Sequence, residues 1–253
     1  MMAHDIPMYY RYNVRHCHYM HVYTGSLGMK RLNNYLFAAL LWDPAIDVET
    51  MVSEYYKIVY KDYAEDMSRL YEKLEYALSN IKQLKHYRSL AERIKNDQKP
   101  LFQTEHFQLT EYHPDINDGI DLIQSVTAIK ECRKIMNAIT AQILPDELAA
   151  IMAEDDKNLF YAENTILFFF YTAQSVEAKW ASDLNRARDF YQMSLPYAVM
   201  LERETEIVQT SSSHANAENG LMATGCEEAY KKLGRELGFD FVGFKTFWEK
   251  RMR

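Results

Sequence analysis

The chain has 253 residues, of which 48% are hydrophobic and 13% aromatic, and its formal net charge is −7 at pH 7. This composition is typical of a globular protein, and the length is enough to bury a substantial core in one large domain or two small ones. Eight glycines and six prolines are few for an all-β fold with many tight turns. The acidic balance offers no basic surplus for nucleic acid, so we expect no nucleic-acid partner.

Three cysteines, Cys17, Cys132 and Cys226, lie far apart in the sequence, and this spacing predicts neither a disulfide framework nor a zinc ribbon. Cys132 falls within a helical pattern and is expected in the core or at its boundary. Residues 1–24 lack the apolar stretch of a signal peptide, and the longest apolar run, 166–171, is too short to span a bilayer. We therefore expect a soluble chain with no membrane partner, cytoplasmic as written and periplasmic if it belongs to a larger exported protein.

The N-terminal segment, residues 1–24, is rich in aromatic residues. Tyr10, Tyr12, Val14 and His16 alternate with their neighbours, a pattern that favours a strand. No later stretch offers a partner strand, and an unpaired strand leaves its backbone donors and acceptors unsatisfied. The segment therefore either pairs with something outside the chain or forms helix and loop.

Residues 25–94 read as a first helical group. Gly25-Ser26 provides a turn and an N-cap, and apolar residues on one helical face follow until Asp43-Pro44 ends the pattern. Asp47 is placed to cap a second helix. The strongest pattern then runs from Met67 to Leu84, with its charged residues on the other faces.

Residues 95–118 are polar, hold two prolines and are expected to connect this group to a second, residues 119–253. Helical patterns cover 122–143, 147–181 and 184–208, and the short links predict an up-down-up, three-helix bundle over 112–208. A polar loop at 209–225 precedes two short helices, 227–237 and 244–251. The predicted fold is mainly α, an antiparallel helical bundle of two packed groups with a strand-like or irregular N-terminal segment.

The first candidate site is the histidine cluster of His16, His18 and His21, which surrounds Cys17. In a strand His16 and His18 share a face, and in a helix His18 and His21 do. Because no regular structure brings all three together, the pattern favours packed or hydrogen-bonded histidines over a ligand pocket or a metal site. We expect no metal and no cofactor.

The acidic residues Glu154, Asp155 and Asp156, and the pair Asp115 and Asp118, are interpreted as a solvated face or helix caps. Neighbouring carboxylates on a helix do not face each other across a substrate, as glycosidase chemistry requires.

Glu163 lies among Phe160, Tyr161 and Ile166, and would need a partner if it were buried.

The loop SSSHAN at 211–216 places serine beside histidine without the orienting acid of a triad. It is interpreted as a structural loop, with ligand contact as the alternative because polar loops often carry binding sites. The candidate ligand-binding residues of the whole chain are His16, His18, His21, Tyr23, Arg31, Asn34, His214 and Asn216.

Three stretches together, HYMHVYTGSLGMKRLNNYLFAALLWDP, FQLTEYHPDINDGIDLIQSVT and SSSHANAENGLMATG, resemble the C-terminal part of a family of large bacterial, Bacteroidetes-type, glycoside-hydrolase-like proteins. That family has a (β/α)8 barrel followed by a helical region, a layout similar to that of α-glucuronidases. The resemblance covers nearly the whole chain. It implies that residues 8–24 correspond to the end of the barrel with its last strand, and residues 27–42 to its closing helix.

None of these stretches is a catalytic motif, so no catalytic residue is carried over from the family. The resemblance implies a non-catalytic helical region that stabilises a barrel, oligomerises or shapes a sugar cleft, with carbohydrate, an upstream barrel domain or a second copy as partner. The alternative is a free-standing helical scaffold or protein-interaction module. A third hypothesis is a small enzyme that uses the histidine cluster together with His214.

Overall fold

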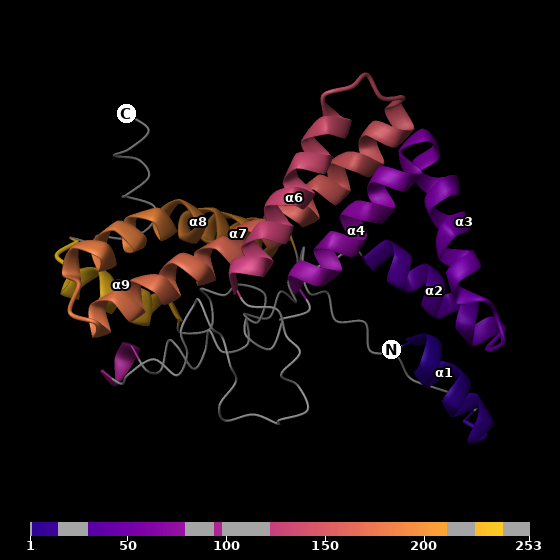
Figure 1. The fold of residues 1–253 in the computed structure, drawn as a ribbon. Coiled ribbons are helices and arrows are strands. Elements are labelled where there is room, and N and C mark those ends of the chain that lie inside the picture. The colour runs from indigo at the N-terminus through magenta and orange to yellow at the C-terminus, as the bar shows by residue number, and fades with distance from the viewer. Residues whose placement is uncertain (1, 15–29, 79–93, 98–121, 212–225, 240–253) are drawn as a thin grey trace.

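The computed structural model describes residues 2–14, 30–78, 94–97, 122–211 and 226–239, and the regular elements within these ranges are helices (Figure 1). They are α1 (Met2–Arg11), α2 (Lys30–Trp42), α3 (Val48–Tyr60), the 3-10 helix η1 (Lys61–Tyr63), α4 (Ala64–Leu78), α6 (Leu122–Thr140), α7 (Asp146–Trp180), α8 (Leu184–Ser211) and α9 (Cys226–Glu236). The predicted mainly α fold is confirmed.

The longest helix, α7, has 35 residues, which corresponds to about 52 Å at 1.5 Å per residue. It contains no glycine or proline, so nothing in its sequence interrupts the backbone hydrogen bonds. In Figure 1 it extends from the group formed by α3, α4 and α6 to the group formed by α8 and α9. Helix α7 therefore belongs to both halves of the molecule.

Two hydrophobic cores share this helix. The first core joins α3, α4 and α6 to the first half of α7, and its fully buried residues include Met67, Leu70, Ile129 and Met136. The second core joins the second half of α7 to α8 and α9, through residues such as Phe168, Tyr191 and Tyr230. Cys132 is buried in the first core, as its helical pattern predicted.

Local sequence signals explain several helix ends. The Asp47 side chain accepts hydrogen bonds from the backbone N–H groups of Glu49 and Thr50 at the start of α3, which confirms the predicted cap. Helix α7 begins directly after Pro145, and α8 begins after a link that Ser182 turns with a φ of 63°. Short links of this kind place consecutive helices antiparallel.

Three sequence-based expectations need correction. Tyr10 lies in α1 and Tyr12 in the turn after it, so residues 2–14 follow the helix-and-loop alternative and not the strand that the alternation favoured. Helices α6 and α8 pack on different halves of α7, so they do not form the predicted three-helix bundle with it. The first and second predicted groups also mix, because α4 packs against α6. Residues 15–29 and 244–251, with the strand and helix predicted there, lie outside the described residues.

Candidate functional site

The structure describes two of the eight predicted ligand-binding residues, Arg31 and Asn34, both on α2. Asn34 is exposed, whereas Arg31 is partly buried against α7. The other six, His16, His18, His21, Tyr23, His214 and Asn216, lie outside the described residues. The histidine cluster and its proposed chemistry therefore stay predictions.

Arg31 belongs to the most concentrated polar group among the described residues, which we call the tyrosine–carboxylate cluster. Its members come from four helices. They are Arg31 of α2, Tyr55, Tyr56 and Tyr60 of α3, Tyr71 of α4, and Glu154 and Asp155 of α7. At its centre the Tyr60 hydroxyl donates to an Asp155 carboxylate oxygen at 2.7 Å and lies 2.7 Å from the Tyr71 hydroxyl oxygen. The Asp155 residue is only 2% exposed.

The chain brings these tyrosines together through the sharp turn between α3 and α4. Tyr60 is the last residue of α3, and Lys61 follows with a φ of 51°, a value that residues with a side chain rarely adopt. Helix α4 then returns past α3 and places Tyr71 beside Tyr56 and Tyr60, with ring centroids 5.4 and 6.1 Å apart. These separations lie within the range in which aromatic rings attract each other.

Burial dominates the electrostatics of the cluster. It raises the pKa of Asp155 above the ordinary value, although the hydrogen bond from Tyr60 and the charge of Arg31 act in the opposite direction. Burial also raises the pKa of Tyr60, and the neighbouring Tyr71 and Asp155 raise it further. The phenols of the cluster are therefore neutral hydrogen-bonding groups at physiological pH.

Two polar atoms of the cluster are buried without a hydrogen-bond partner in the described part of the chain: the Tyr55 hydroxyl oxygen and Nη1 of Arg31. Nη1 lies 3.9 Å from an Asp155 carboxylate oxygen, which is too far for a hydrogen bond. The short contact of Arg31 is instead from Nη2 to Glu154. Within the described ranges, the cluster therefore contains two buried polar atoms whose hydrogen-bonding capacity is not used.

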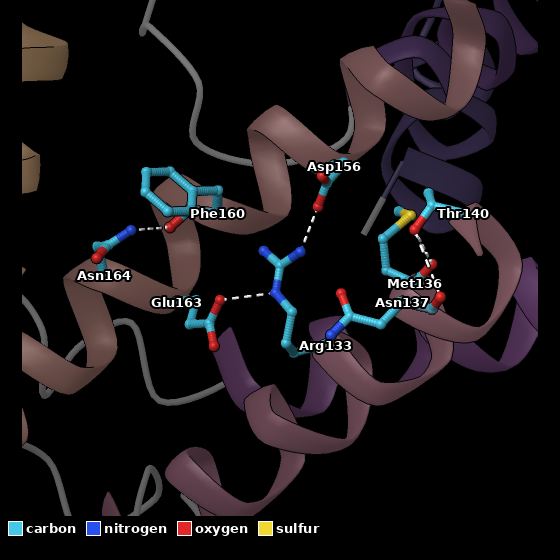
Figure 2. A network of polar contacts seen from close by, with 8 residues as sticks. All are labelled: Arg133, Met136, Asn137, Thr140, Asp156, Phe160, Glu163 and Asn164. Atoms are coloured by element: carbon cyan, nitrogen blue, oxygen red, sulfur yellow. Dashed lines mark hydrogen bonds and ion pairs between the residues drawn. The ribbon is translucent and has the colours of Figure 1, made fainter. Parts of the chain in front are cut away.

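A second polar group joins α6 to α7, and Figure 2 shows it. Arg133 of α6 donates from Nε to Glu163 at 2.8 Å and from Nη1 to Asp156. The Glu163 side chain is only 18% exposed, so the partner that its apolar sequence surroundings required is present. The arginine connects two carboxylates that lie two turns apart on α7, and it ties the helices together.

A third polar group lies in the second core. The Ser194 hydroxyl donates to the Tyr191 backbone carbonyl and also contacts the Tyr230 hydroxyl, while the Tyr191 ring stacks on the Tyr230 ring at 4.6 Å. These groups bond to each other across α8 and α9. Their geometry accounts for helix packing without a nucleophile–base pair that could act on a substrate.

The interpretation of residues 154–156 as a solvated face was wrong for Asp155, which is buried. A signal for this was present in the sequence, because Asp155 follows Met152 by three residues and precedes Leu159 by four, on the apolar stripe of α7. Asp156 and Glu154 are engaged in ion pairs with Arg133 and Arg31.

No group of three or more metal-ligating side chains is arranged to hold an ion within the described ranges. None of the helices described is both long and apolar enough to cross a membrane. No family model, curated protein or solved structure matches the chain.

Proposed function

We propose that this chain is a helical scaffold that binds another protein through the aromatic arm surface, defined as Tyr9 of α1, Tyr12 in the turn after it, and Leu41 and Trp42 of α2. The main observation in support of this proposal is that the Trp42 residue, at the end of α2, is 92% exposed. The other three members are exposed as well, and α1 packs against α2. Tyrosine and tryptophan are enriched in protein interfaces because they bury a large apolar area with little loss of side-chain entropy.

The rest of the described chain supports a scaffold over an enzyme. Each polar group discussed above joins neighbouring helices, and its members contact each other. A continuous α7 shared by two cores provides a rigid support for an interaction surface. The exposed aromatic side chains, in contrast, contribute little to the packing of either core.

The test is site-specific photo-cross-linking in the native host, with a photoreactive phenylalanine analogue at position 42 and a control at the fully exposed Ile143, in the loop between α6 and α7. We expect an adduct with one defined protein at position 42 that is absent at position 143. Trp42→Ala should weaken binding of the purified partner. Identical adducts at both positions, or none at position 42, would contradict the proposal. An adduct with a second copy would identify the partner as the chain itself.

A second proposed function follows the family resemblance: a non-catalytic, carbohydrate-associated helical region of a glycoside-hydrolase-like protein. Its support in the structure is that Trp42 and the exposed Asn34 lie on the same helix, eight residues apart, or about 80° around the axis. An aromatic ring with a nearby amide can contact a sugar by stacking and hydrogen bonding. Calorimetric titration with uronic-acid-containing oligosaccharides tests it. Heat that Trp42→Ala removes would support it, and no heat with the unaltered chain would reject it.

A further inference from the structure

The aromatic arm surface ends at the corner where α2 passes into α3 (Figure 1), and the charged residues of this corner are all acidic. We call it the acidic corner and define it as Asp43, Asp47 and Glu49, each of which is exposed. They are the only charged residues in the range 32–53 of the sequence. Asp43 directly follows Trp42, and Asp47 caps α3 at the other end of the link. The exposed Trp42 therefore lies next to a group of carboxylates.

The charge of the acidic corner is not compensated within the described part of the chain. Asp43 and Asp47 accept hydrogen bonds from backbone N–H groups of the corner, which orient the two carboxylates but leave their charge in place. None of the three acidic side chains forms an ion pair with another described residue. The preceding cation in the sequence, Arg31, is engaged by Glu154. Helix α1 adds no net charge to the surface, because it holds one aspartate and one arginine.

An exposed indole ring beside unpaired carboxylates fits an arginine side chain. A guanidinium group stacks on the face of a tryptophan ring, and its N–H groups can donate to a carboxylate in pairs. A partner with an anionic surface, such as a nucleic acid, would be repelled by the same carboxylates. Two copies of this chain that docked through a symmetric interface at this corner would bring like charges together, which is also unfavourable. Charge complementarity therefore favours a basic partner.

We infer that the partner protein presents a basic, arginine-containing segment to the aromatic arm surface, with a guanidinium group on the Trp42 ring and the carboxylates of the acidic corner beside it. This inference rests on the proposed function, because it names the chemistry of the partner at the same surface. Exposed charges of opposite sign accelerate association and are screened by salt. Binding at this surface should therefore weaken as the salt concentration rises.

The sequence of the cross-linked segment of the partner is the first test. Photo-cross-linking in the native host is carried out at position 42 and at the neighbouring exposed Leu41, which leaves Trp42 in place. The adducts are digested and sequenced by mass spectrometry, and we expect a segment of net positive charge that contains arginine. A neutral or acidic segment, or a second copy of this chain, would overturn the inference while the proposed binding surface stood. No adduct at either position would contradict both proposals.

A charge-neutral variant of the acidic corner is the second test, with the purified cross-linked partner as the probe. Asp43→Asn, Asp47→Asn and Glu49→Gln together remove the charge and keep hydrogen-bond acceptors, and asparagine caps helices as well as aspartate does. The Kd should rise by about five- to tenfold at low salt and by less at high salt.

The matched control combines Asp183→Asn with Asp189→Asn. It neutralises a cap and a second exposed carboxylate on α8, which packs on the other half of α7. This control should leave the Kd unchanged. If the variant of the acidic corner bound like the unaltered chain, or if the control weakened binding as much, the inference would be wrong.

Discussion

Replacing Arg133 with methionine tests how much the tie between α6 and α7 contributes to stability. The change keeps most of the apolar stem but leaves Glu163 and Asp156 without their cation. Removing one partner of a fully buried ion pair costs about 3–5 kcal/mol. The Arg133 side chain is 20% exposed and that of Asp156 is 41% exposed, so solvent screens part of the loss and we expect about 2–3 kcal/mol. The measurement is urea unfolding followed by far-ultraviolet circular dichroism.

A matched control is available on α4, where Arg69 pairs with Asp66 and both side chains are largely exposed. Arg69→Met should change the free energy of unfolding by less than about 0.5 kcal/mol. The double variant Arg133→Met with Glu163→Met should recover part of the loss, because it removes the more buried of the two carboxylates that Arg133→Met leaves unpaired. If Arg133→Met were as mild as Arg69→Met at an unchanged m-value, the assignment of Arg133 as a structural tie would be refuted.

Three further outcomes are expected. Gly234→Ala would place a Cβ atom 2.3 Å from the Tyr191 hydroxyl oxygen and 2.8 Å from Cζ of the same ring. It should therefore lower the free energy of unfolding by about 1–3 kcal/mol, despite the higher helix propensity of alanine. Adding Tyr191→Phe should lessen but not abolish this loss, and a stabilising effect of Gly234→Ala would contradict the close packing. The Cys132 thiol is buried, and burial raises its pKa to about 12. In a variant lacking the other cysteines, this thiol should therefore react with a thiol reagent only at the rate of unfolding. Rapid modification of the native chain would instead place Cys132 at the surface. The raised pKa of Tyr60 means that the native state holds the phenolic proton of Tyr60 more tightly than the unfolded state does. The free energy of unfolding should therefore fall as the pH rises above about 10. If a Tyr60→Phe variant showed the same alkaline fall in the free energy of unfolding, Tyr60 would not be its cause.

The helices were predictable because their signals are local. Apolar periodicity indicated α6, α7 and α8 to within a few residues, and Asp47 and Pro145 marked two helix starts. For residues 2–14 the strand interpretation was wrong and the helix-and-loop alternative holds, because alternating aromatic residues over a few positions fit the exposed side of a helix as well as a strand. The grouping of helices in space also failed, because short links fix the direction of a neighbouring helix but not which half of a long helix it covers.

The candidate site was less predictable because its residues meet only in three dimensions. Tyr60 and Asp155 are 95 positions apart, and Arg133 and Glu163 are 30 apart. Sequence reasoning correctly required a partner for a buried Glu163 but could not name it. For Asp155 the position on the apolar stripe was visible, yet an acidic run at the middle of a helix more often faces solvent.

The continuity of α7 has a consequence for how the molecule unfolds. Ile166 and Leu167 belong to the first core and Phe168 and Phe169 to the second, so the two cores meet on adjacent residues of one helix. If one core unfolded while α7 stayed helical, the apolar side chains of α7 that belong to that core would be exposed to water. This exposure raises the free energy of the partly unfolded state. Phe168→Ala removes a buried side chain of the second core, a change that typically costs about 3–5 kcal/mol. It should therefore lower two urea midpoints together: that of the exposure of Cys132 in the first core, and that of the loss of helix followed by far-ultraviolet circular dichroism. Separate midpoints for these two signals would show that the cores unfold independently and that α7 does not couple them.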